Sequence, residues 1–202
     1  MTKISVPSKT LQRFVKLYES LEPKAPETLK CLRIEITNGK IILIGCNQYV
    51  ACAELVDNTK ESDAVIHVKV NSKFIECVNK EVNINGMFNF ETVSEIALGN
   101  VSTTDGENHN DFIVWPDESP LDNWRKWFST SDESVGTMFC NLYQIETLFN
   151  TSPTGEISFP TVINCSEPVI VRDVNNGNWI GAFIPAFDGK KIIKPAELPE
   201  WL

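Results

Sequence analysis

Residues 32–45 read LRIEITNGKIILIG, two strand-like segments joined by Asn38-Gly39. In the first segment apolar residues alternate with Arg33 and Glu35, the pattern of a strand that has one face buried and one face in water. Asn-Gly favours a two-residue type I′ turn, because both central residues of that turn need positive φ. The second segment is continuously apolar from Ile41 to Ile44, so we expect it to be covered on both faces or paired in an interface. The stretch therefore predicts an antiparallel hairpin.

The hairpin belongs to a unit that occurs three times: a short strand, an amphipathic helix, and then strands joined by tight turns. The units begin near Ile4, Val65 and Gly136, and each contains an Asn-Gly pair. Their helices are predicted over residues 8–21, 72–80 and 141–150. The same order found three times is poorly explained by chance. We therefore predict an α+β fold in which helices lie on one face of antiparallel sheets.

Residues 102–110 are polar and rich in turn formers, so they mark the predicted domain boundary. On this division residues 1–104 form a domain of two units. Residues 111–186 form a second, abridged domain, because a strand at 111–116 and a helix at 120–128 precede the third unit without returning strands. Residues 187–202 extend past the last unit as a C-terminal tail.

The composition describes an ordinary soluble globule, with 42% apolar and 22% charged residues. No apolar run approaches the roughly 20 residues that span a bilayer. The six cysteines lack metal-ligand spacing and favour a reduced, cytoplasmic protein. His67 and His109 have no metal-binding neighbours, and no nucleophile elbow, phosphate loop or zinc-protease motif occurs. We therefore expect no enzyme activity, no metal and no cofactor.

A net charge of −9 argues against a protein that simply coats nucleic acid, although a local basic face remains compatible with DNA contact. Lys9, Arg13 and Lys16 follow one another at i, i+4 and i+7, and so share a face of the first helix. An ordinary solvated surface is the more common explanation of such a triplet taken alone. The second helix repeats the pattern weakly with Lys73 and Lys80, and the third helix lacks Lys and Arg.

The end of the last unit carries the most specific pattern. An apolar strand from Val169 ends in Asp173, and after a short turn an aromatic and aliphatic strand runs from Trp179 to Pro185. With the three units, this hairpin resembles the closing hairpin of the DNA sliding clamp family, in particular the bacterial polymerase beta clamp. The segment at 111–116 is similar to the step that leads the family's chain into its last domain.

The resemblance implies a ring of helices around duplex DNA, an outer wall of sheets, and an apolar pocket near the closing hairpin that tethers polymerases or other clamp-binding proteins. It implies sequence-nonspecific DNA contacts by the basic residues Lys9, Arg13, Lys16, Lys73, Lys80, Arg125 and Lys126. It implies a pocket for a partner peptide formed by Val169, Val171, Phe183, Ile184 and Pro185. Two domains per chain divide a six-domain ring evenly, so a homotrimer is the expected assembly.

Adjacent strand residues face opposite ways, so one of Phe183 and Ile184 should be available to a partner's apolar anchor. Two other functions stay open. One is a clamp-like interaction module or inhibitor that binds a polymerase or host clamp without encircling DNA, which the abridged domain and the apolar Trp201-Leu202 favour. The other is an acidic DNA mimic or inhibitor, which only the net charge supports.

Overall fold

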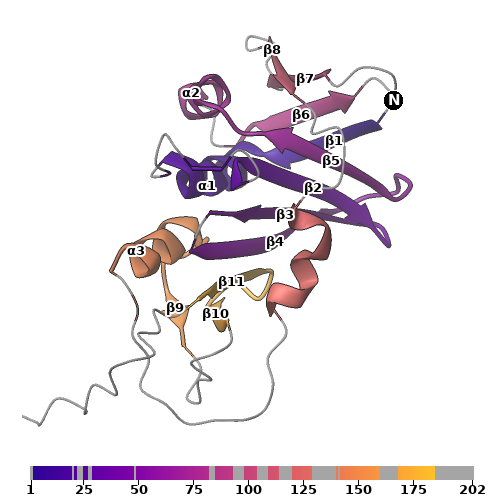
Figure 1. The fold of residues 1–202 in the computed structure, drawn as a ribbon. Helices are drawn as coiled ribbons and strands as arrows, with labels where there is room; N and C mark the ends of the chain where they lie inside the picture. The colour runs from indigo at the N-terminus through magenta and orange to yellow at the C-terminus, as the bar shows by residue number, and fades with distance from the viewer. Residues whose placement is uncertain are drawn as a thin grey trace, which may run out of the picture.

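The computed structural model describes residues 2–19, 21, 25–26, 29–47, 49–81, 85–92, 98–103, 109–113, 120–128, 140, 142–159 and 168–184 (Figure 1). The elements in chain order are β1 (Thr2–Pro7), α1 (Ser8–Glu19), β2 (Cys31–Thr37), β3 (Lys40–Cys46), β4 (Val50–Asn58), β5 (Ala64–Lys69), α2 (Ser72–Lys80), β6 (Met87–Thr92), β7 (Leu98–Thr103), β8 (His109–Ile113), the 3₁₀ helix η2 (Pro120–Phe128), α3 (Leu142–Thr151), β9 (Ile157–Ser158), β10 (Val169–Asp173) and β11 (Trp179–Phe183). Among these residues, no helix is long and apolar enough to cross a membrane.

The strands form two antiparallel sheets, one of four strands in the order β1-β6-β7-β8 and one of seven in the order β5-β2-β3-β4-β11-β10-β9. The first strand of each of the first two units joins the sheet of the other unit: β1 pairs with β6, and β5 pairs with β2. This reciprocal exchange binds the two units into one body. The third unit joins them through the pairing of β11 with β4.

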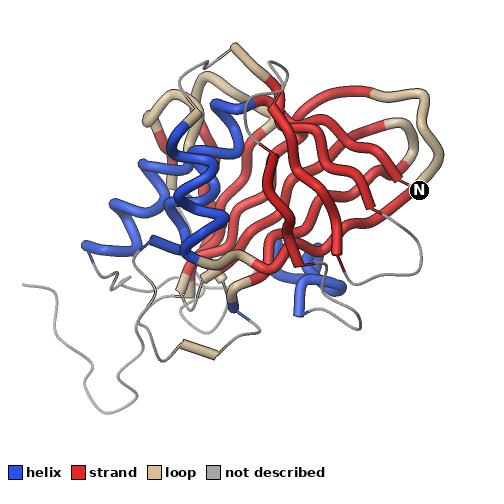
Figure 2. Tube along the Cα trace, turned by 90° about the horizontal axis from the view of Figure 1, so that it is seen from above, coloured by secondary structure: helices blue, strands red, loops and turns tan. Residues whose placement is uncertain are grey.

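Helices α1, α2 and α3 are grouped on one side of the strands (Figure 2), with α1 in contact with both of the others. The apolar stripe of α1, which includes Leu11, Phe14 and Leu17, is fully buried in the main core. A Cβ atom at Gly45 would lie 2.8 Å from Cδ1 of Leu17, so glycine allows β3 to approach this helix closely. The predicted α+β class, with helices on one face of antiparallel sheets, is confirmed.

Strand β3 is covered on both faces, as its continuous apolar run predicts. Ile41 and Leu43 belong to the core beneath α1, whereas Ile44 packs on the opposite face with residues of η2. The prediction that Arg33 and Glu35 face water is wrong, because η2 lies over them and leaves them 8% and 4% exposed.

The predicted linker at residues 102–110 is also wrong. Its first residues end β7, its last residues begin β8, and these two strands pair in register from Leu98 opposite Ile113 to Ser102 opposite His109. The strand predicted to open the second domain is therefore an edge strand of the four-stranded sheet. The predicted tail at 187–202 lies outside the described residues.

Candidate partner-binding pocket and helix surface

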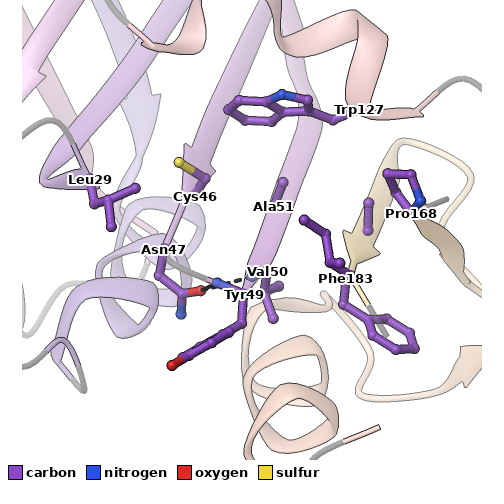
Figure 3. Close-up of a pocket in the computed structure, with 11 residues that line it drawn as sticks. Leu29, Cys46, Asn47, Tyr49, Val50, Ala51, Trp127, Pro168 and Phe183 are labelled. Carbon is purple, nitrogen blue, oxygen red and sulfur yellow. Dashed lines mark hydrogen bonds between the residues drawn. The ribbon is translucent and has the colours of Figure 1, made fainter. Parts of the chain in front are cut away.

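An apolar pocket lies where β4 meets β11, at the end at which Val50 pairs with Phe183. Its volume is about 240 Å³. Figure 3 shows the side chains that line it. The lining residues are Leu29, Cys46, Asn47, Tyr49, Val50, Ala51, Trp127, Pro168, Ala182, Phe183 and Ile184. They come from four parts of the chain that are far apart in the sequence: Leu29 before β2, the β3–β4 connection with the adjoining strand ends, η2, and the closing hairpin.

Asn47 is the amide side chain in this lining, and its hydrogen bonds are directed to the protein. Its Oδ1 accepts from the backbone N–H groups of Tyr49 and Val50, both at 2.8 Å. Its Nδ2 donates to the Leu17 carbonyl at 3.2 Å and to the Tyr143 hydroxyl at 3.3 Å. Asn47 thus shapes the β3–β4 connection, and the cavity favours an apolar occupant.

Cys46 presents a neutral thiol to the pocket. Burial, together with the nearby Cys31, raises the pKa of its side chain to about 12. At neutral pH the sulfur therefore behaves as a small apolar group and not as a nucleophile.

The structure separates the predicted pocket residues. Phe183 and Ile184 line the pocket, but Val169 and Val171 are buried in the core, so their predicted place in the lining is wrong. Pro185 lies outside the described residues. The side chain of Phe183 is 1% exposed and meets Phe159 edge-on, whereas that of Ile184 is 64% exposed.

The backbone of Ile184 is fixed although its side chain is exposed. Its N–H donates to the Tyr49 carbonyl at 3.3 Å, and its carbonyl accepts from Nε2 of Gln144 at 2.9 Å. Tyr49 is 46% exposed and meets Tyr143 edge-on, with ring centroids 6.4 Å apart. Tyr49 and Ile184 thus form an exposed part of the pocket lining, and a backbone hydrogen bond joins them.

The sequence analysis did not predict the part of the pocket wall formed by Cys46, Asn47, Tyr49, Val50, Ala51 and Trp127. A sequence pattern can indicate a strand, but it does not give the register that places β4 beside β11. The strongest local signal is Tyr49, two residues after Asn47, because its side chain is exposed beside the exposed Ile184, and adjoining exposed apolar groups can mark an interaction site.

Lys9 and Lys16 on α1 and Lys73 on α2 are exposed on the helix surface. Lys80 is exposed too, but its Nζ lies 2.6 Å from Oε1 of Glu76, and this partner raises the pKa of the lysine. The basic surface on the helices is therefore smaller than the sequence predicts.

Arg13 does not share the exposed face of Lys9 and Lys16, contrary to the prediction. Its Nη2 donates to both carboxylate oxygens of Glu54, at 2.7 and 2.6 Å, and its Nε donates to the Thr151 carbonyl at 3.2 Å. The pair is largely buried, with side chains 13% and 7% exposed. Burial raises the pKa of Glu54 although Arg13 opposes that shift. Arg13 thus joins α1 to β4 and to the end of α3.

Arg125 and Lys126 lie on η2, on the face of the seven-stranded sheet opposite α1, so they do not extend the surface of Lys9 and Lys16. Nη2 of Arg125 donates to Oε1 of Glu35 at 2.5 Å, and the guanidinium lies 4.3 Å from the centroid of the Trp124 ring. Burial alone would raise the pKa of Glu35, but hydrogen bonds from Arg125, Trp124 and Arg33 lower it. Among the described residues, no group of His, Cys, Asp and Glu could hold a metal ion.

No protein-family model and no curated protein matches the chain. Solved structures of bacterial sliding clamps do. The DNA polymerase III subunit beta of Borrelia burgdorferi aligns at a TM-score of 0.64 and 11% identity, over 94% of this chain and 65% of that chain. Subunit beta of Pseudomonas aeruginosa aligns at 0.62 and 10%, over 93% and 67%. The sliding clamp of Caulobacter crescentus aligns at 0.62 and 8%, over 98% and 70%.

The chain has a sliding-clamp-like fold, as the resemblance at the closing hairpin predicts. It spans about two thirds of the length of the clamp chains that it matches.

Proposed function

We propose that this chain is a sliding-clamp-like processivity factor, a binding protein that holds a polymerase or another replication protein near duplex DNA. The observation that carries the proposal is the apolar pocket at the β4–β11 junction, with Ile184 exposed at its rim. An apolar cavity of about 150 Å³ accepts benzene. A pocket of about 240 Å³ is therefore large enough for a leucine or phenylalanine anchor of a partner peptide.

The DNA side of the proposal depends on Lys9, Lys16 and Lys73. All three are exposed on helices of the same layer, and phosphate contacts by lysine are insensitive to sequence, which a sliding protein requires. The overall charge of −9 would keep the rest of the surface away from DNA.

The pocket is tested with a fluorescently labelled peptide that carries leucine and phenylalanine anchors. We expect the parent to bind it, and Ile184→Ala or Tyr49→Ala to weaken binding by about 2 kcal/mol, because a few buried anchors supply most of the affinity of such pockets. Fluorescence polarisation gives the dissociation constants. Val174→Ala is the matched control, since Val174 is an apolar side chain, 61% exposed, outside the pocket lining. The peptide-binding role of the pocket would be contradicted if the parent failed to bind the peptide, or if both rim variants bound it as tightly as the parent does.

The DNA surface is tested with the triple variant Lys9→Glu, Lys16→Glu, Lys73→Glu, which leaves the Arg13–Glu54 pair intact. We expect retention on circular duplex DNA to be lost and the salt dependence of binding to flatten, because the exposed cations that displace counterions are reversed. The control is Lys3→Glu, Lys40→Glu, Lys60→Glu, which changes the net charge equally at exposed positions outside the helices. Equal retention of the two triple variants would assign the helix lysines to an ordinary solvated surface.

The second candidate is a clamp-fold interaction module that does not encircle DNA. Two observations favour it: Arg13 is withdrawn from the helix surface, and α3 exposes Leu142, Glu146 and Phe149 instead of basic residues. A homotrimer stays the assembly predicted for a closed ring. Light scattering separates the candidates, because a strict monomer that still binds the partner peptide would favour the module.

A further inference from the structure

Helix η2 forms one wall of the pocket, although it is not an element of the repeated unit. It crosses the outer face of the seven-stranded sheet, where Leu121 is fully buried and Trp124 is 8% exposed against residues of β3 and β4. Three residues further on, Trp127 lines the pocket. In Figure 3 its indole lies over Cys46 and Ala51, on the side away from Phe183.

Two carboxylates hold η2 on the sheet. Glu35 of β2 accepts from Nε1 of Trp124 at 3.1 Å and from Nη2 of Arg125 at 2.5 Å. Asp122 of η2 accepts from Nη1 of Arg33 at 2.5 Å. The buried Arg33 and Glu35 also bond to each other at 3.0 Å, so both anchors belong to one network on β2.

The two sides of the pocket are held in different ways. Most of the lining residues lie on or beside β3, β4 and β11, whose backbone pairing sets their positions. Trp127 reaches the pocket from η2, which is held by side-chain contacts to the sheet. The size of the cavity therefore depends on the docking of η2.

We propose that η2 sets the selectivity of the pocket: Trp127 limits the size of the apolar group that enters, and Glu35 is the positioning residue that holds Trp127 there through Trp124 and Arg125. This inference rests on the proposed peptide-binding function of the pocket. It names the partner's anchor more narrowly, as a single leucine or phenyl-sized side chain, with an indole disfavoured.

The test measures binding of two small probes, toluene and indole, by NMR titration of the parent and of each variant. Trp127→Ala should raise the affinity for indole relative to toluene by about tenfold or more, because pocket volume discriminates between apolar groups to about that extent. Glu35→Ala should shift the ratio of indole affinity to toluene affinity in the same direction, although Glu35 does not line the pocket. Glu76→Ala removes an exposed carboxylate that also pairs with a cation, and should leave the ratio unchanged.

Two milder variants keep the test decisive if a truncation unfolds the chain. Trp127→Phe removes one ring of the indole, and Glu35→Gln keeps an acceptor for Trp124 while removing the charge that faces Arg125. Each should change the ratio in the same direction by a smaller factor. A loss of folding stability alone would weaken both probes together and leave the ratio unchanged.

Each outcome decides between the two proposals. If the Trp127 and Glu35 variants keep the parent's ratio, the selectivity role of η2 is wrong even when peptides still bind. If the parent binds toluene but none of a panel of leucine, phenylalanine and tryptophan peptides, the peptide-binding function fails, whereas a shifted ratio would still support the role of Trp127. If the parent binds neither probe, both proposals are overturned.

Discussion

Replacement of Arg13 by alanine is expected to lower the free energy of unfolding by about 3–5 kcal/mol, because it leaves the Glu54 carboxylate buried without its counter-charge. The variant also loses the hydrogen bond from Nε to the Thr151 carbonyl, which joins α1 to α3. Urea unfolding followed by circular dichroism measures the difference between variant and parent.

The pH dependence of that difference identifies its cause. Burial already raises the pKa of Glu54 in the presence of Arg13, and loss of the guanidinium raises it further. The destabilisation should therefore be largest where Glu54 is ionised and should shrink as the pH falls and the carboxyl is protonated. The double variant Arg13→Ala, Glu54→Gln should recover part of the stability at neutral pH. A deficit that is constant with pH and is not reduced in the double variant would show that Arg13 acts through packing alone.

This result bears on the function, since Arg13 is one of the residues that a helical-face pattern assigns to DNA. A reversal of Lys9, Arg13 and Lys16 together would place two carboxylates against each other at the buried Arg13–Glu54 pair, so a loss of DNA binding would not separate destabilisation from the loss of a DNA contact. The spacing i, i+4, i+7 correctly gives a shared helical face. It cannot show that the middle residue is at the edge of that face, within reach of a carboxylate on β4.

Local patterns predicted the parts of the fold that depend on local physics. Asn38 and Gly39 have φ of 50° and 70°, as a type I′ turn requires, and α2 spans the residues that its apolar spacing predicts. The prediction fails at Asn176-Gly177. There Arg172 pairs with Ile180, so the connection is longer than two residues. Asp173 organises this turn by accepting from the N–H groups of Asn175 and Asn176, and the side chain of Asn176 accepts from the Asn178 N–H at 2.9 Å.

The missed parts depend on contacts between distant segments. Arg33 and Glu35 have the alternation of a solvated strand face, and only the docking of η2 buries them. The composition of residues 102–110 is that of a linker, and it does not show that the residues at its two ends belong to β7 and β8, which pair with each other. Of the pocket lining, Phe183 and Ile184 were predictable from the closing hairpin. The residues of the β3–β4 connection required the register of β4 against β11, and Trp127 required the docking of η2.

Asp173 closes the last hairpin and is 4% exposed. One carboxylate oxygen, Oδ2, accepts from the Ser152 hydroxyl and from the Thr154 N–H at 2.9 Å. The other, Oδ1, accepts from the Thr154 hydroxyl at 2.9 Å and from the N–H groups of Asn175 and Asn176 at 2.9 and 2.8 Å. The carboxylate thus ties the end of α3 to the β10–β11 turn, next to the strand that ends at the pocket.

Asp173→Asn should lower the free energy of unfolding at neutral pH by about 3 kcal/mol, because an amide nitrogen faces donors that the carboxylate accepted, and hydrogen bonds to a charged group are the stronger ones. Burial alone would raise the pKa of Asp173, but the hydrogen bonds from Ser152, Thr154 and Asn175 lower it below its ordinary value. A carboxyl with a lowered folded-state pKa stabilises the protein above its unfolded-state pKa, and that stability is lost as the pH falls through the folded-state value. The difference in free energy of unfolding between parent and variant should therefore be largest at neutral pH and should narrow in acid, where the parent's carboxylate is protonated.

Urea unfolding at a series of pH values measures this difference. The control is Asp57→Asn, which changes an exposed carboxylate on β4. If this difference in stability stayed constant as the pH falls, or if Asp57→Asn destabilised the protein as much as Asp173→Asn does, the charge of Asp173 would not be what stabilises the hairpin. If the difference in stability narrows as expected, the variant should also bind the peptide more weakly than the parent at neutral pH. The turn leads into β11, and the end of β11 places Phe183 and Ile184 in the pocket lining.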